Sequence, residues 1–156
     1  MTGLFRSLLF VPGNNPRFLE KAKSIPADII CFDLEDSVPE TEKENARDLI
    51  KKALASRSQY AASVYVRTNA PASGKIPDDL ERIVQRGLDG IVIPKVNTAK
   101  DVLKITKMLS HLEKNRKLPK TVIIPSIESS LGVMNTFEIA SSSKRVVAVV
   151  FGVFDL

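Results

Sequence analysis

The chain has 156 residues, 44% of them hydrophobic and 26% charged, which are ordinary values for one globular domain with a real core. Its net charge of +5 is spread over helical stretches without interleaved aromatic residues, which argues against a nucleic-acid partner and fits an anionic small substrate. One cysteine, no signal peptide before Arg6 and no apolar run of roughly 20 residues exclude a disulfide framework and a membrane span, and predict a cytoplasmic protein.

The first part of the chain alternates between apolar runs and helical patterns. Residues 7–11 (SLLFV) predict a strand, and Asn15 and Pro16 then predict the capped start of a helix that Pro26 ends. Residues 29–34 are almost entirely apolar without alternation, which is typical of a parallel strand covered on both faces. The pattern therefore begins as strand, helix, strand.

The same alternation continues to the end of the sequence. Further strands are predicted at residues 63–67, 90–96, 121–127 and 145–151. Helices between them are predicted to begin near Pro39, Pro77, Thr98 and Ser129. The last of these helices is predicted to carry Met134, Phe137 and Ile139 as its apolar residues.

Six strand–helix units of roughly 25–33 residues predict an α/β fold with a parallel sheet and right-handed crossovers. No linker or shift in composition divides the chain, so we expect a single domain over residues 1–156. Two architectures remain open at this point. One is a doubly wound open sheet, and the other is part of an eight-stranded barrel, which needs two more units.

Charged residues stand where the predicted strands end, and the carboxyl ends of parallel strands are where ligands bind. These ends carry, in order, Pro12-Gly13, Glu35-Asp36, Arg67, Lys95, Glu128 and Asp155. Glu128 and Asp155 are hard oxygen ligands that leave neighbouring strands, and with water they suit Mg²⁺. One Cys and one His cannot build a zinc site, and no Gly-rich phosphate loop follows the first strand.

Each of these residues also has a structural interpretation. Arg67 beside a flexible loop suits anion binding, but it could instead neutralise Asp36 in an ion pair. For Lys95 two interpretations stay open: an ion pair with the nearby acids, or a contact with the substrate. Glu35 and Asp36 could cap the next helix, or hold Arg67 and metal-bound water, without reacting themselves. The two metal candidates could act only as a helix-start carboxylate and a terminal cap.

Six segments together carry a resemblance: RSLLFVPGNNPRFLEKA, CFDLEDSVPETEKENAR, VYVRTN, GIVIPKV, IIPSIESSLGV and VVFGVFDL. In this order, over essentially the whole chain, they resemble the citrate lyase beta subunit and malyl-CoA lyase family of Mg²⁺-dependent aldolases. The resemblance implies a (β/α)8 TIM barrel, here incomplete with only about six βα units. It also implies a trimeric or hexameric carbon–carbon lyase that cleaves or forms 3-hydroxy-acyl thioesters such as citryl- or malyl-CoA.

The resemblance assigns roles to individual positions. It implies that Glu128 and Asp155 bind Mg²⁺ and that Arg67 contacts a substrate oxygen, with Glu35 and Asp36 near metal-bound water. The predicted catalytic residues are therefore Arg67, Asp36 and Glu35. The predicted substrate-binding residues are Arg67, Glu128, Arg6, Arg17 and Lys95. The implied partners are an acyl thioester on CoA or an acyl carrier protein, further copies of the chain, and other citrate lyase subunits.

The chemistry of retro-aldol cleavage fits these residues. Mg²⁺ acts as a Lewis acid on the 2-keto acid, and Arg67 adds a fixed positive charge at an oxygen whose negative charge grows. A base must also take the hydroxyl proton. In malyl-thioester lyases of the family that base is an aspartate from the C-terminal region of a neighbouring subunit, and in this chain Asp36 is the candidate.

Two departures from the family pattern leave alternatives open. Phe154 stands where the family commonly has Glu, and the sequence ends one residue after Asp155, without the last two strands. We expect either a fragment of a longer chain or a truncated member that needs oligomerisation. The alternative functions are an aldolase for a free 2-keto-4-hydroxy acid, and an inactive barrel that serves in binding or assembly.

Overall fold

A computed structural model describes residues 5–153 of the protein. Six strands form one parallel sheet in which each strand pairs with the next in the sequence. They are β1 (Leu8–Pro12), β2 (Ile29–Asp33), β3 (Ser63–Arg67), β4 (Gly90–Ile93), β5 (Val122–Ile127) and β6 (Val150–Phe151). All their carboxyl ends therefore lie at one edge of the sheet.

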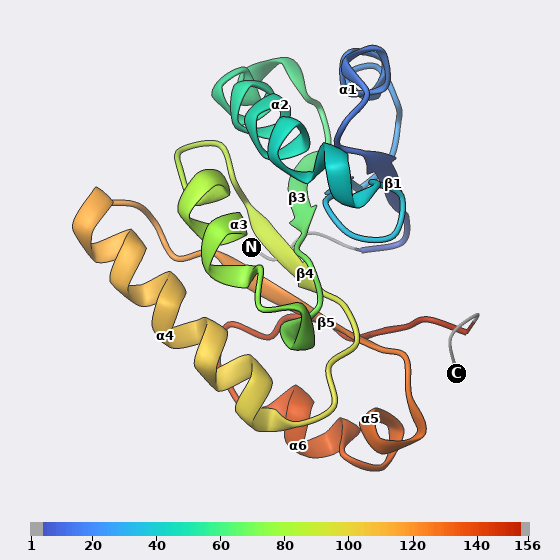
Figure 1. The fold of residues 1–156 in the computed structure, drawn as a ribbon, viewed down its shortest axis with the longest axis vertical. Helices are drawn as coiled ribbons and strands as arrows, with labels where there is room; N and C mark the ends of the chain where they lie inside the picture. Colours follow the sequence, from blue (N-terminus) through green and yellow to red (C-terminus); the bar gives the residue numbers. More distant parts are fainter. Residues whose placement is uncertain (1–4, 154–156) are drawn as a thin grey trace.

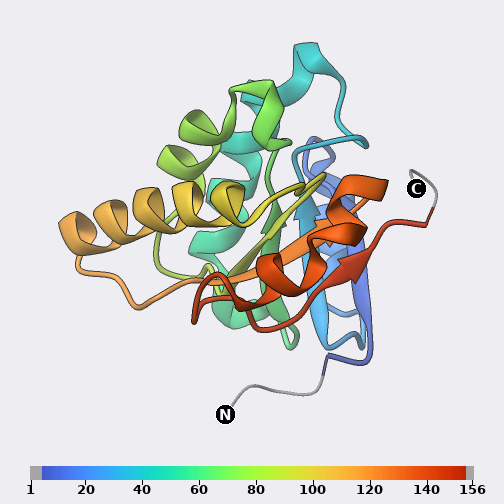
Figure 2. The same ribbon diagram turned by 90° about the horizontal axis from the view of Figure 1, so that it is seen from below.

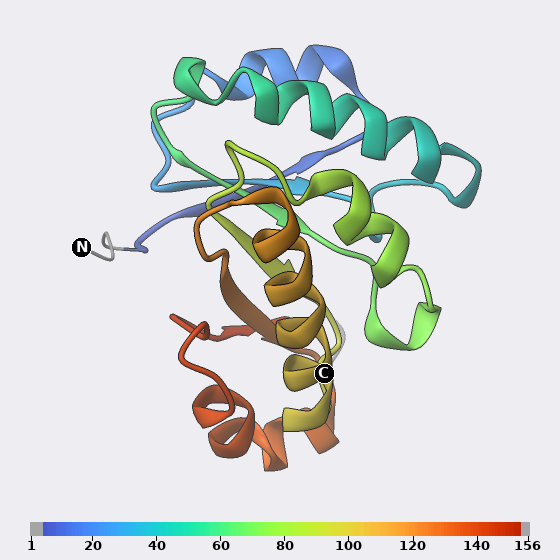
Figure 3. The same ribbon diagram turned by 90° about the vertical axis from the view of Figure 1, so that its left-hand side faces the viewer.

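The helices connect these strands and follow one another along one face of the sheet (Figures 1 and 3). They are α1 (Pro16–Ala22), α2 (Lys43–Ala55), α3 (Ile76–Ile83), α4 (Ala99–Arg116), α5 (Ser130–Met134) and α6 (Thr136–Ser141). Short 3-10 turns add η1 (Glu40–Glu42), η2 (Arg57–Gln59) and η3 (Pro71–Ser73). Within residues 5–153, no helix combines the length and apolarity needed to cross a membrane.

Strand order and helix placement decide between the two expected architectures. A doubly wound sheet changes direction partway and carries helices on both faces. Here the strand order is sequential, the sheet curls (Figure 2), and α1 contacts α2, α2 contacts α3, and α3 contacts α4 along the same side. The fold is thus a six-stranded half-barrel, which confirms the predicted incomplete TIM barrel.

Alternate residues of each strand face opposite sides of the sheet, and both sides are apolar. Ile30, Phe32, Val64 and Val66 belong to the core beneath the helices. Their neighbours Ile29, Cys31, Tyr65, Val92 and Ile124 form a second buried cluster on the inner, concave face. Together the two clusters contain the four apolar residues of β2, and the whole strand is buried, as its apolar run predicts. The same alternation carries Asp33, Arg67 and Glu128 onto the inner face at the carboxyl edge.

Two predicted helix starts are confirmed in detail. The side chain of Asn15 accepts hydrogen bonds from the backbone N–H groups of Arg17 (3.1 Å) and Phe18 (3.3 Å) at the start of α1. At the start of α4 the Thr98 backbone N–H donates to the Asp101 carboxylate at 2.9 Å. Each cap satisfies amide groups that a helix leaves without a partner. These caps fix where the chain turns back after β1 and β4.

The last predicted unit differs from the structure. The single helix expected after Ser129 is divided at Asn135 into α5 and α6, and β6 covers only Val150–Phe151 rather than residues 145–151. Arg145, expected in the strand, is instead buried in an ion pair with Glu113 at 2.6 Å. The side chains of Met134 and Phe137 are not buried but 83% and 84% exposed.

A pair of substitutions on α6 tests this arrangement. We expect Phe137→Ser to change the free energy of unfolding by less than about 0.5 kcal/mol, because an exposed side chain loses little packing. We expect Ile139→Ala on the same helix to lower it by about 2–5 kcal/mol, because Ile139 is fully buried. Urea denaturation measures both, and equal losses would contradict the assignment of the two faces of α6.

Candidate functional site

The centre of the carboxyl edge is an ion pair between Asp33 and Arg67, which are register partners on β2 and β3. The guanidinium of Arg67 donates two hydrogen bonds to the Asp33 carboxylate, from Nε and Nη2, each 2.7 Å long. Asp33 is fully buried and also accepts from the backbone of Glu35 at 2.9 Å. Burial acts to raise the pKa of Asp33, but the hydrogen bonds and charge of Arg67 outweigh it and lower that pKa.

Asp33 is thus the main partner of Arg67, rather than Asp36, which the structural interpretation of the sequence had paired with it. The remaining guanidinium nitrogen, Nη1, lies 3.3 Å from Glu35 Oε2 and 3.9 Å from Asp36 Oδ2. Asp33 lies in the segment CFDLEDSVPETEKENAR that carries the resemblance, but the sequence alone did not indicate it as the partner of Arg67. Arg67 is therefore held rigidly on one side, while its third nitrogen points along the rim of the edge.

Phe10 is a site residue that the sequence analysis missed. The Cζ atom of Arg67 lies 4.6 Å from the centre of the Phe10 ring, which is the arrangement of a cation–π contact. The alternation of side chains along a strand could have indicated Phe10, because it lies two residues before Pro12 and therefore on the same face of β1. The ring and the Asp33 carboxylate together fix the plane of the guanidinium.

Lys95, Glu35 and Asp36 form the outer rim of the edge. The ammonium of Lys95 contacts Glu35 Oε1 at 2.8 Å and Asp36 Oδ1 at 3.2 Å. Burial raises the pKa of Glu35 more than the cations Lys95 and Arg67 lower it. The backbone of Lys95 has φ = +51°, in the left-handed region that non-glycine residues rarely occupy. Strained residues of this kind cluster at functional sites.

Lys43 binds the backbone of the segment that carries Glu35, and the sequence did not indicate it as a site residue. It is buried, and its ammonium donates to the backbone oxygens of Leu34 (2.6 Å) and Glu35 (2.7 Å). These are the first two residues after β2. Lys43 stands among the acids of the η1–α2 junction, a pattern typical of an ordinary exposed helix start.

Glu128 follows β5 directly and is buried, with 7% of the residue exposed. Its Oε2 atom has no hydrogen-bond partner anywhere in residues 5–153. A buried carboxylate oxygen without a partner is unfavourable and calls for a cation or another ligand. Glu128 therefore fits the role of one Mg²⁺ ligand, because carboxylate oxygens are the ligands that this ion prefers.

The part of the chain that the structure describes does not contain a complete set of side-chain ligands for such a metal. Residues 5–153 contain no group of three or more His, Cys, Asp or Glu side chains that could hold a metal. The second predicted ligand, Asp155, lies outside the described residues. Arg67 and Glu128 lie at the same edge of the sheet, with β4 between their strands.

The two predicted arginine contacts near β1 lie at opposite edges. Arg17 is exposed in the first turn of α1, which follows the carboxyl end of β1. Arg6 precedes β1, and its guanidinium pairs with Asp28 at 2.8 Å, just before β2. Hydrogen bonds from Arg6 lower the pKa of Asp28 to about 2. The structure thus brings Arg17, but not Arg6, to the edge that carries the site.

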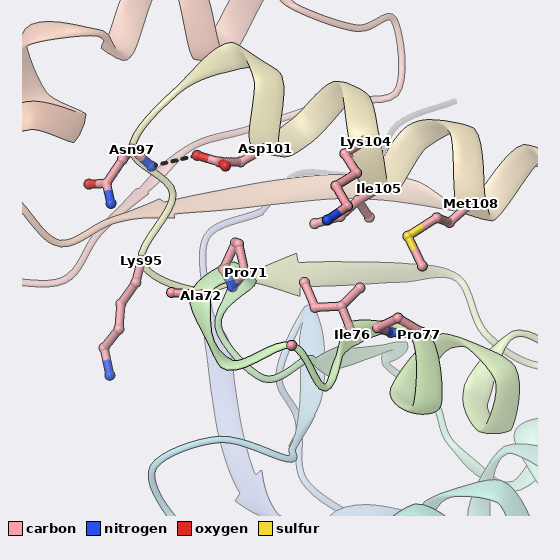
Figure 4. Close-up of a pocket in the computed structure, with 11 residues that line it drawn as sticks. Pro71, Ala72, Ile76, Pro77, Lys95, Asn97, Asp101, Lys104, Ile105 and Met108 are labelled. Carbon is pink, nitrogen blue, oxygen red and sulfur yellow. Dashed lines mark hydrogen bonds between the residues drawn. The ribbon is translucent and has the colours of Figure 1, made fainter.

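A cleft of about 250 Å³ lies next to the rim, between α4 and the segment from η3 to the start of α3 (Figure 4). Its apolar walls are formed by Pro71, Ile76, Pro77, Ile105 and Met108. Lys95 also lines this cleft (Figure 4), and its ammonium contacts Glu35 and Asp36 at the rim. Lys95 therefore lies where the cleft meets the acidic rim.

Comparisons with known proteins show what the chain as a whole is similar to. The family model described as HpcH/HpaI aldolase/citrate lyase matches residues 6–156. Citrate lyase subunit beta of Escherichia coli (strain K12) is 40% identical over 152 residues, covering 96% of this chain and 50% of that protein. A (3S)-malyl-CoA thioesterase of Cereibacter sphaeroides (strain ATCC 17025 / ATH 2.4.3) is 36% identical over 152 residues, covering 97% of this chain and 50% of that protein.

Solved structures give the same result. A citrate lyase beta subunit from M. tuberculosis, complexed with oxaloacetate and magnesium, superposes with a TM-score of 0.76 at 26% identity, covering 96% of this chain and 58% of that one. The protein CitE from Mycobacterium tuberculosis, in complex with magnesium, acetoacetate and coenzyme A, gives 0.75 at 26% identity, covering 96% and 49%. The chain spans about half the length of the curated relatives it matches.

Proposed function

The chain belongs to the HpcH/HpaI aldolase/citrate lyase family, and from that premise we propose that it carries part of a Mg²⁺-dependent carbon–carbon lyase site. Its substrate is a 3-hydroxy-acyl thioester of the citryl or malyl type, and its products are a 2-keto acid and an acetyl thioester. One observation carries the proposal: Glu128 presents a buried carboxylate oxygen that has no hydrogen-bond partner within residues 5–153, at the edge that also holds Arg67. The magnesium, oxaloacetate and coenzyme A bound to the neighbouring structures support it.

Glu128 and Asp155 are the residues that we propose to hold Mg²⁺. When bound there, the ion supplies Lewis-acid stabilisation for the oxygens of the keto acid. Arg67 binds a keto-acid oxygen through Nη1, the nitrogen that Asp33 leaves free. Because Asp33 and Phe10 fix its guanidinium, Arg67 needs little reorganisation when negative charge develops at that oxygen.

The reaction also requires a proton acceptor. In cleavage, the substrate hydroxyl loses its proton to a base, the carbon–oxygen bond becomes a carbonyl, and the carbon–carbon bond breaks. The electron pair of that bond passes to the thioester fragment as an enolate, which then takes up a proton. Asp36 is the candidate base in this chain, since 53% of its side chain is exposed at the rim. Lys95 orients it through its contact with Asp36 Oδ1, and Glu35 holds the same ammonium.

The thioester carrier would approach from the β1 side of the edge. Arg17, exposed after the Pro12-Gly13 turn, offers a cation to the phosphates of CoA or of an acyl carrier protein. We propose further copies of this chain and other citrate lyase subunits as its protein partners, by analogy with the relatives named citrate lyase subunit beta.

A second candidate function is thioester hydrolysis, favoured by the relatives named (3S)-malyl-CoA thioesterase. The two reactions give different products from the same substrate. A lyase converts malyl-CoA to glyoxylate and acetyl-CoA, whereas a thioesterase converts it to malate and free CoA.

The deciding experiment incubates the protein with citryl-CoA and malyl-CoA in Mg²⁺ and, in parallel, in excess EDTA, and identifies the products by mass spectrometry. We expect a keto acid and acetyl-CoA only in the presence of Mg²⁺. Malate and free CoA would favour the thioesterase. Binding of acyl-CoA without turnover would favour an assembly role, and cleavage of a free 2-keto-4-hydroxy acid without any effect of acyl-CoA would favour the other aldolase class.

A further inference from the structure

We propose that Gly152 is a positioning residue for the Glu128 carboxylate: its missing side chain leaves the space in which the stem of Glu128 lies. The inference rests on the proposed function in one respect, namely that Glu128 binds a divalent cation. The contact between the two residues stands on its own geometry. Gly152 follows β6, and Glu128 follows the neighbouring strand β5.

A side chain at residue 152 would meet one other side chain first, that of Glu128. A Cβ atom added at Gly152 would lie 2.6 Å from Cγ of Glu128, 3.2 Å from its Cδ and 3.5 Å from its Oε1. These three nearest atoms all belong to one side chain. At Gly13 and Gly132, by contrast, the nearest atom to an added Cβ is a backbone oxygen, whereas at Gly90, as at Gly152, the three nearest atoms belong to a single side chain, that of Tyr65. An added methyl group at residue 152 would thus displace mainly Glu128.

Backbone conformation does not explain this glycine. Gly74 and Gly87 have φ values of +75° and +100°, where a side chain is strained whatever the space around it. Gly152 is not among the residues with positive φ. Its backbone therefore accepts alanine, and the reason for a glycine at this position is the neighbouring side chain.

The backbone of Gly152 is itself fixed against β5. Its N–H donates to the carbonyl of Ile127 at 2.9 Å, directly beside Glu128, and Phe151 is the register partner of Ile127. The backbone at Gly152 is thus fixed in place and packs against the aliphatic part of the Glu128 side chain. This fixed backbone limits the rotamers of Glu128 and holds its Oε2, which has no hydrogen-bond partner in residues 5–153, in its buried position. Supporting groups of this kind typically change metal affinity by about 10–100-fold.

The first test is metal affinity, with Mn²⁺ as the probe and electron paramagnetic resonance as the readout. We expect Gly152→Ala to raise the Kd for Mn²⁺ by about 10-fold or more, by analogy with other residues that orient metal ligands. The matched control is Gly74→Ala, the same chemical change at a position where an added Cβ meets nothing within 4 Å. It should lower the melting temperature and leave the Kd unchanged. An unchanged Kd in Gly152→Ala, with binding lost in Glu128→Gln, would overturn the proposal.

The second test needs no metal and separates this inference from the proposed function. In EDTA, Gly152→Ala should lower the melting temperature when it is introduced into the original protein. It should not lower the melting temperature further when it is introduced into the Glu128→Ala variant, because that variant lacks the atoms that the added methyl group meets. Equal losses in both backgrounds would overturn the proposed contact. If the unchanged protein and Glu128→Gln bind Mn²⁺ equally well, the metal assignment fails, and this cycle alone decides whether Gly152 positions Glu128.

Discussion

Glu128→Gln should lower the rate of Mg²⁺-dependent thioester cleavage by about a thousandfold, since a Lewis-acid metal contributes several kcal/mol and each 1.36 kcal/mol is tenfold in rate. The amide has almost the same shape as the carboxylate, so the buried site stays filled. It lacks the negative charge that attracts a divalent cation. The loss should appear in kcat/KM at the Mg²⁺ concentration that just saturates the original protein, measured by release of the keto acid.

The matched control for this experiment is Glu138→Gln. Glu138 is an exposed glutamate on α6, ten positions further along the chain, and we expect it to keep full activity. The melting temperature of each variant in EDTA shows whether the fold is intact. Glu128→Gln with at least a tenth of the original activity would remove Glu128 from the metal site and leave the proposed chemistry without its ligand.

The order of elements in this fold could be predicted because its signals are local. The apolar run of β2, the Asn15 cap and the Thr98 start each involve only a few neighbouring residues. The last unit could not be predicted, because its form depends on contacts from elsewhere. Arg145 leaves the strand for a buried ion pair with Glu113, which is 32 positions away in the sequence. The division at Asn135 leaves Phe137 exposed, although its hydrophobicity predicts burial.

The sequence predicted which residues belong to the site better than it predicted which residues they contact. Strand ends in a parallel fold indicated Arg67, Lys95 and Glu128 as residues of one edge, and the structure gives them that edge. Their partners depend on the register between strands, which decides that Arg67 faces Asp33. Topology alone argues against Arg6, which precedes its strand and so lies at the amino edge. The resemblance suggested Arg6 because it lies in a matching segment.

The ion pair between Asp33 and Arg67 yields the largest expected effect on stability. We expect Asp33→Asn to lower the free energy of unfolding by about 3–5 kcal/mol, the usual loss when one partner of a buried ion pair is removed. Asp33 is fully buried and only 15% of the Arg67 side chain is exposed, so water cannot replace the lost carboxylate. Asp48→Asn, at an exposed pair with Arg82, should cost less than about 1 kcal/mol.

The same pair predicts how stability depends on pH. Because the pKa of Asp33 is lower in the folded state than in the unfolded chain, the pair stabilises the protein fully above the unfolded value of about 4. That stabilisation is lost as the pH falls through the lower, folded-state pKa. Urea midpoints between pH 7 and pH 3 should therefore converge for the original protein and Asp33→Asn at the acid end. A gap between them that stays constant over this range would mean that Asp33 does not carry the charge that holds Arg67.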